Sequence, residues 1–174
     1  PQGTGVLLCG QGTAPQPLLE GGTGSLSLSQ NMPDFLPDRL EAGTHNMPGI
    51  AGLLAGVRFV RRQGTDAILR HEYALTRRTA ERLSRLPGME AFAQPEAAEQ
   101  AGVLSFRVPG RDVEAVGELL AEHGIAVRAG LHCAPLAHRT AGTLDTGTVR
   151  VSFSAFSTLR EVDALVRVLA ESLR

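Results

Sequence analysis

The sequence contains no lysine, no tryptophan and only two cysteines. Because all 17 basic residues are arginine, no Schiff base to a lysine side chain can form on this chain. Cys9 and Cys133 lie far apart among 174 residues, without the density of a disulfide scaffold, so we expect a reducing, cytoplasmic compartment. No apolar run approaches the roughly 18 residues of a membrane span. A net charge of −1 also excludes a nucleic-acid binder that works by bulk positive charge.

Residues 10–46 carry no sustained helical or strand period. They are rich in Gly, Pro, Ser and Thr and follow a short apolar run, Val6–Cys9, which predicts a strand with Cys9 as a small buried hydrophobe. Structureless connections longer than about 15 residues are uncommon inside compact domains. We therefore expect residues 10–46 to form an arm whose packing surface is missing from the chain.

Residues 47–174 predict a compact domain. Apolar residues at helical spacing predict helices over 48–64 and 65–85. Further elements follow in the order strand, strand, helix, strand, strand, helix, at 89–93, 103–108, 112–123, 125–128, 148–154 and from the capping box at Thr158 onwards. This order predicts an α+β fold with a mixed or antiparallel sheet and helices on one side.

Two arginines and a cysteine are predicted to converge at one end of this sheet. Because side chains alternate along a strand, Arg128 and Arg150 fall in the polar phase, and the loop between their strands carries His132 and Cys133. A fixed guanidinium group suits a substrate carboxylate, and a cysteine beside a histidine and arginines can be held as thiolate. The alternatives are a solvated arginine face and a small buried cysteine, but the polar setting of Cys133 favours the functional interpretation.

Three weaker patterns accompany this group. His132, Cys133 and His138 could ligate a metal, but their spacing does not match a paired zinc site, and we expect no metal. Two glycine-rich segments, 21–25 and 41–46, could each bind an anion through backbone amides. Each of them alone is as well explained by a flexible turn.

Together these motifs resemble one family. Arg128–Pro135 (RAGLHCAP), followed by Thr148–Ser152 (TVRVS), is similar to the active-cysteine segment of the class V aminotransferase-like cysteine desulfurases, a group that includes selenocysteine lyases. Glu41–Asn46 (EAGTHN) resembles the family's glycine-threonine signature, and Pro1–Gly5 (PQGTG) is similar to the stretch after its pyridoxal-phosphate lysine.

The resemblance implies a fold-type-I pyridoxal-phosphate enzyme. The chain would hold the tail of its large domain and an interface arm, 1–46, and its complete small C-terminal domain, 47–174, with the lysine lying upstream. Such enzymes are homodimers, in which Thr44, beside Gly43, would reach the phosphate of the cofactor bound by the partner subunit. Without the lysine, the chain alone is expected to be inactive.

The resemblance also implies roles for the converging residues. Cys133 would accept sulfur from L-cysteine as a persulfide, leaving alanine, and Arg150 would hold the substrate carboxylate. Arg128 and His132 belong to the same motif, and we expect them to assist substrate binding and catalysis. A sulfur-acceptor protein would be a further partner.

Several alternatives remain open at this point. The residues do not distinguish cysteine from selenocysteine as the substrate. An aminotransferase or epimerase of the same superfamily would keep the cofactor, although Cys133 argues against both. The alternative from another class is a cofactor-free sulfur-carrier or binding module that is loaded at Cys133 by a partner.

Overall fold

The computed structural model describes residues 2–93 and 100–173, and it divides by internal contacts into two compact units, Pro1–Arg62 and Gln63–Arg174. The first contains a short 3-10 helix, η1 (Asp38–Leu40), and nearly all of helix α1 (Met47–Gln63). We expected the division after residue 46. It lies sixteen residues later because α1 groups with the N-terminal unit and not with the sheet. The assignment of 1–46 to a larger domain stays a prediction.

The N-terminal unit departs from the expectation at its start. Residues 6–9 form no strand, because no other described segment hydrogen-bonds to them in a ladder. Leu8 is 89% exposed, and Cys9, expected to be buried, is also exposed. The expectations of a strand and of a buried Cys9 were therefore wrong for the described chain.

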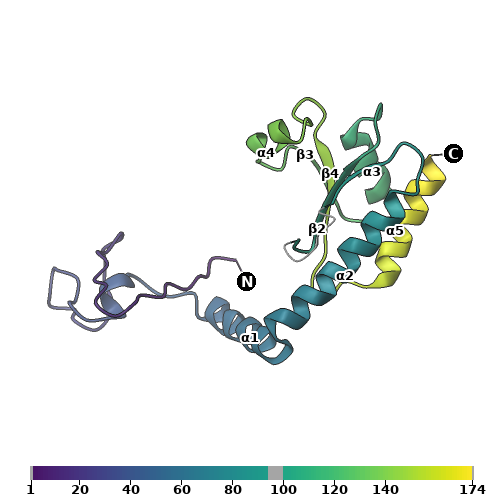
Figure 1. Ribbon diagram of the computed structural model, residues 1–174. Coiled ribbons are helices and arrows are strands. Elements are labelled where there is room, and N and C mark those ends of the chain that lie inside the picture. The colour runs from purple at the N-terminus through teal and green to yellow at the C-terminus, as the bar shows by residue number, and fades with distance from the viewer. Residues whose placement is uncertain (1, 94–99, 174) are drawn as a thin grey trace. The chain divides into compact units, whose positions relative to one another are not determined.

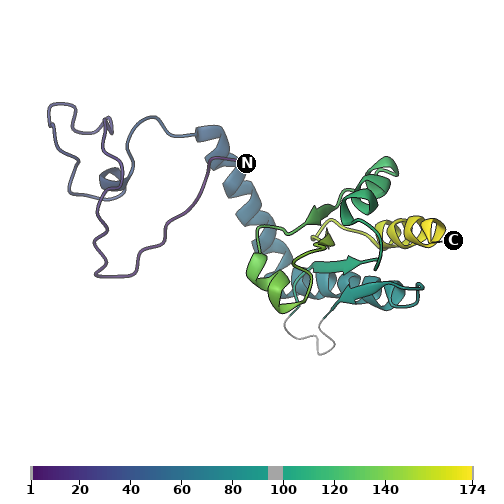
Figure 2. The same ribbon diagram turned by 90° about the horizontal axis from the view of Figure 1, so that it is seen from above.

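The C-terminal unit contains one four-stranded antiparallel sheet with the strand order β1-β2-β4-β3. Figure 1 labels β2, β3 and β4 of this sheet, and Figure 2 shows the same unit from above. The α+β expectation is confirmed. The strands and helices of this unit are α2 (Thr65–Leu83), β1 (Glu90–Phe92), β2 (Val103–Arg107), α3 (Val113–Glu122), β3 (Arg128–Gly130), α4 (Pro135–Thr140), β4 (Thr148–Ser152) and α5 (Leu159–Ser172).

The core of this unit lies between one face of the sheet and helices α2, α3 and α5. Leu104 and Phe106 of β2 and Val149 and Val151 of β4 point into it and are at most 5% exposed. Their alternation leaves the intervening side chains, among them Ser105 and Arg150, on the other face. None of the helices in the described ranges is long and apolar enough to cross a bilayer.

Two elements differ from the expectation. The predicted strand at 125–128 is displaced toward the C-terminus, and β3 begins at Arg128. The reason is local: the backbone N–H of Ile125 donates to the carbonyl of Leu120 at 2.9 Å and so closes helix α3 instead of joining the sheet. Helix α4 was not predicted, although Pro135 stands at its start, a position that proline favours.

Candidate active site

Two arginines lie directly opposite each other on the open face of the sheet. Arg128 of β3 and Arg150 of β4 are Cα partners, and Ser105 of β2 is the partner of Arg150 on its other side. Like charges in such a cross-strand pair repel, and neither arginine has an acidic partner within the described ranges. The Nε of Arg150 is buried and has no hydrogen-bond partner in the protein. A buried unpaired donor is costly, so this arrangement favours an anionic ligand such as a carboxylate.

The two ends of the loop between β3 and β4 lie close together at Gly130 and Gly147, and we call this close approach the glycine neck. Gly147 has φ +68°, and a Cβ placed on it would lie 3.0 Å from the backbone of Gly130. No other residue type fits this approach without displacing the backbone. The neck therefore fixes both ends of the segment that contains His132, Cys133 and α4.

Cys133 is exposed at a turn of this loop. His132 and Cys133 both have left-handed backbone conformations, with φ 53° and 56°, which are unusual for residues other than glycine. The N–H of Ala134 donates to the carbonyl of Leu131 at 2.9 Å and closes the turn. The thiol is thus presented to solvent by a defined backbone conformation.

His132 lies under this turn and faces the arginines. Its Nε2 lies 3.1 Å from the hydroxyl of Thr148, while its Nδ1 is buried without a protein partner. Burial first, and then the positive charge of Arg150, His138 and Arg128, lowers the pKa of His132. The imidazole is therefore neutral at neutral pH, and a neutral imidazole can accept a proton.

His138 of α4 is buried beside His132. Its Nδ1 lies 2.8 Å from the hydroxyl of Thr143, and the two imidazole rings are 5.6 Å apart at an angle of 41°. The described residues contain no group of three or more His, Cys, Asp or Glu side chains arranged to hold a metal ion. Sequence reasoning considered His138 only as a metal ligand and missed the threonines, whose signal was the Thr-rich stretch after α4.

A shallow hollow of about 210 Å³ lies on the same face of the sheet, between α4 and strands β1, β2 and β4. It is lined by Phe92, Val103, Ser105, Ala137, His138, Ala141, Thr143 and Thr148. His138, Thr143 and Thr148 thus border both this hollow and the surroundings of His132.

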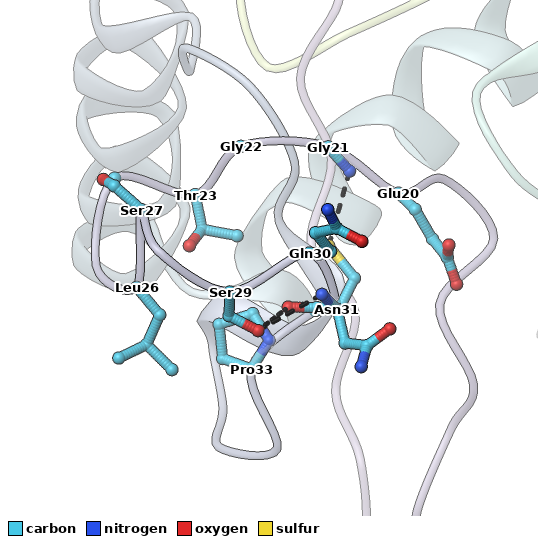
Figure 3. Close-up of a pocket in the computed structure, with 12 residues that line it drawn as sticks. Glu20, Gly21, Gly22, Thr23, Leu26, Ser27, Ser29, Gln30, Asn31 and Pro33 are labelled. Atoms are coloured by element: carbon cyan, nitrogen blue, oxygen red, sulfur yellow. Dashed lines mark hydrogen bonds between the residues drawn. The ribbon is translucent and has the colours of Figure 1, made fainter.

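In the N-terminal unit, the two glycine-rich segments are joined. The N–H of Gly43 donates to the carbonyl of Gly22 at 2.8 Å, and Gly43 has φ +82°. Thr44 is exposed next to this bond, and the hydroxyls of Thr23 and Ser25 lie 2.9 Å apart. A polar hollow of about 370 Å³ opens over residues 20–33 (Figure 3).

Pyridoxal phosphate, the cofactor that the resemblance implies, would need a donor for its phosphate and an amine for its aldehyde. The N–H of Gly43 is already bonded to Gly22, but the exposed hydroxyl of Thr44 is a donor that suits the phosphate end of that cofactor. The chain contains no lysine amine for the aldehyde end. The residues that sequence reasoning selected are thus divided, with Gly43 and Thr44 in one unit and the arginine–cysteine group in the other.

Known proteins resemble this chain over most of its length. A family model described as aminotransferase class-V matches residues 1–165. A probable cysteine desulfurase of Mycobacterium leprae is 36% identical over 173 residues, which cover 97% of this chain and 28% of the relative. The apo structure of a cysteine desulfurase from Thermococcus onnurineus superposes with a TM-score of 0.77 at 36% identity, over 90% of this chain and 39% of the other.

A third similarity concerns the cofactor. A variant of the protein C-DES, described with glycine covalently linked to its pyridoxal-phosphate cofactor, matches with a TM-score of 0.61 at 26% identity, over 77% of this chain and 31% of the other. The chain spans less than half the length of each of these relatives.

Proposed function

Because the chain belongs to the aminotransferase class-V family, whose relatives include pyridoxal-phosphate proteins, we propose that it supplies the thiol and the carboxylate clamp of a cysteine desulfurase. The relatives are more than twice as long as the chain. The proposed activity is therefore that of a polypeptide in which this chain is joined to a lysine-bearing cofactor domain, and the 174 residues alone are expected to be inactive.

The observation that carries this proposal is the unpartnered arginine pair beside the cysteine loop. Arg150 has a buried Nε with no partner, and Arg128 stands opposite it without an acidic neighbour in the described chain. An arginine fork binds a carboxylate in two parallel hydrogen bonds. An amino-acid substrate held at Arg150 would lie next to the strand that leads into the Cys133 loop.

The residues of this chain then have distinct tasks in the reaction. Bound pyridoxal phosphate supplies the electron sink. Arg150 orients the substrate through its carboxylate, and neutral His132 can accept the thiol proton near Cys133. The Cys133 sulfur attacks the sulfur of L-cysteine, so that an S–S bond forms, the carbon–sulfur bond breaks, and alanine leaves after protonation of its β-carbon.

Thr44 and Gly43 have a separate task in the proposal. In a homodimer, the Thr44 hydroxyl would donate to the phosphate of the cofactor bound by the other subunit, and Gly43 would let the backbone approach it. The hydrogen bond between Gly43 and Gly22 supports this role, because it fixes the turn that carries Thr44.

The matched pair Cys133→Ala and Cys9→Ala tests the proposal in the intact enzyme. Both cysteines are exposed, but only Cys133 lies in the loop that joins the strands of Arg128 and Arg150. We expect Cys133→Ala to keep the visible absorbance of the cofactor and to abolish sulfide release from L-cysteine, and Cys9→Ala to release sulfide at the parent rate. Undiminished release from Cys133→Ala would contradict the proposal. Sulfur loading of Cys133 by a partner protein, without cofactor, would favour the carrier module instead.

A further inference from the structure

His138 has no task in the proposed reaction, yet it is one of the most firmly held side chains in the loop. It is 6% exposed, and Thr143 is 1% exposed. The His138 N–H donates to the carbonyl of Ala134 at 3.1 Å, the Thr143 N–H donates to the carbonyl of His138 at 2.8 Å, and the His138 Nδ1 lies 2.8 Å from the Thr143 hydroxyl. Backbone and side chain of His138 are therefore both anchored.

The anchored ring of His138 packs against His132. The ring centroids are 5.6 Å apart, within the range of a tilted aromatic pair. On its other side, His132 is held by the hydroxyl of Thr148, which is 3% exposed. His138 and Thr148 thus confine the imidazole of His132 from two directions, next to the turn that carries Cys133.

This confinement accounts for an otherwise unfavourable backbone. Two consecutive left-handed residues, His132 and Cys133, cost on the order of 1–3 kcal/mol each, and such conformations persist only where their surroundings fix them. Beyond the glycine neck, two side-chain hydrogen bonds hold the histidines beside this turn, namely that of His132 with Thr148 and that of His138 with Thr143.

We propose that His138, anchored by the hydroxyl of Thr143, is a positioning residue that holds the His132 imidazole and the left-handed turn of Cys133 in place. The proposal deepens the proposed function and rests on it for its catalytic consequence. The alternative is a core histidine that only fills space between α4 and the sheet. The two alternatives differ in what happens to His132 when the Thr143 hydroxyl is removed.

The test compares Thr143→Val with Thr143→Ser in the full 174-residue chain. Valine keeps the shape of threonine and removes the hydroxyl, whereas serine keeps the hydroxyl. The measurement is the NMR titration of the His132 ring in a histidine-labelled chain, with the signal assigned by its loss in His132→Gln. The charged or titratable groups that face His132 are Arg128 from β3, Arg150 from β4 and His138 from α4.

The expected result follows from the confinement of His132. In Thr143→Val, the ring of His138 is released, His132 becomes more exposed to solvent, and its titration midpoint rises toward the ordinary value. In Thr143→Ser, the midpoint stays at that of the parent. An unchanged midpoint in folded Thr143→Val, or equal rises in both variants, would overturn the proposal. If Thr143→Val does not fold, His138→Asn, which lacks the ring, takes its place with the same expected rise.

A second readout separates positioning from substrate binding. In the intact enzyme, Thr143→Val is expected to lower kcat for desulfuration roughly ten- to a hundredfold, the scale of a small misplacement of reacting groups, and to leave KM for L-cysteine within about twofold, because Arg150 is untouched. A raised KM with unchanged kcat would contradict the positioning role. If the parent enzyme releases no sulfide at all, the proposed function fails, and the titration alone decides the positioning of His132.

Discussion

At the scale of single residues, the arginines of the sheet differ in whether they have an acidic partner among the described residues. Arg107, on the same face of the sheet, has a carboxylate partner, with its Nε 2.5 Å from Glu90. Arg128 and Arg150 face each other instead. Like charges directly opposite each other on neighbouring strands are destabilising, and an anion held between them would offset this repulsion.

This difference gives opposite predictions for two arginines of one sheet. Arg128→Gln removes the repulsion with Arg150 and should raise the free energy of unfolding by a few tenths of a kcal/mol at low salt. This increase in the free energy of unfolding should fade toward 1 M salt, where the Debye length is about 3 Å and the repulsion is screened. Arg107→Gln loses the bond to Glu90 and should lower the same free energy by roughly 0.5 kcal/mol. Urea unfolding at two salt concentrations measures both effects. Destabilisation by Arg128→Gln at low salt would mean that this arginine has a stabilising partner.

At the scale of elements, the alternation of apolar and polar residues correctly predicted the strands whose side chains form the core. Leu104, Phe106, Val149 and Val151 alternate with polar residues, and the structure buries all four. The strand predicted at 125–128 was misplaced because Ile125 and Val127 pack on the core without joining the sheet. The alternation of apolar and polar residues does not distinguish a strand of the sheet from an unpaired segment that packs on the core. The prediction of a strand at Val6–Cys9 was wrong because a strand needs a hydrogen-bonding neighbour. The local sequence pattern does not reveal whether such a neighbour exists.

The types of residue in the candidate site could be predicted from the sequence, but the pairings and contacts that position them could not. Alternation along the strand placed Arg150 on the polar face, and the structure has Arg150 half-buried on the open face of the sheet. The neighbouring Gly, His and Pro residues indicated an exposed thiol at Cys133, and Cys133 is exposed. The direct pairing of Arg128 with Arg150 depends on the register between β3 and β4. The contact of His138 with Thr143 depends on helix α4, which was read as loop.

The capping box of helix α5 was predicted from sequence and carries a prediction of its own. The hydroxyl of Thr158 accepts from the N–H of Glu161, and the Glu161 carboxylate accepts from the N–H of Thr158 at 2.6 Å. Helix α5 contributes five residues to the core. Thr158→Ala should therefore lower the free energy of unfolding by about 1 kcal/mol, whereas Thr158→Ser, which keeps the acceptor, should stay close to the parent in urea unfolding. Equal losses in both variants would assign the effect to the methyl group of threonine.

At the scale of the whole molecule, burial is distributed unequally between the two units. Among the residues that the structure describes, the fourteen buried residues of the core cluster all lie between Leu75 and Leu169. In the first unit, α1 buries only Gly49 among its 17 residues, and apolar residues on its length remain 40% to 48% exposed, namely Ile50, Leu54, Val57 and Val60. Most of the stability of a helix in a protein comes from the packing of its apolar face, so α1 should open far more readily than the sheet unit.

Limited digestion with trypsin tests this difference in stability between α1 and the sheet unit. Trypsin cleaves after lysine and arginine, and because the chain contains no lysine, every target is an arginine. Cleavage after Arg58, Arg61 or Arg62 of α1 should precede cleavage within α2 and leave a product that begins near Gln63 and persists. Mass spectrometry of a time course identifies the first sites. The core variant Leu169→Ala should lose roughly 2–5 kcal/mol and shorten the lifetime of that product without changing the rate of cleavage in α1. First cleavage within α2, or joint protection of α1 and the sheet unit, would show that the two units unfold as one.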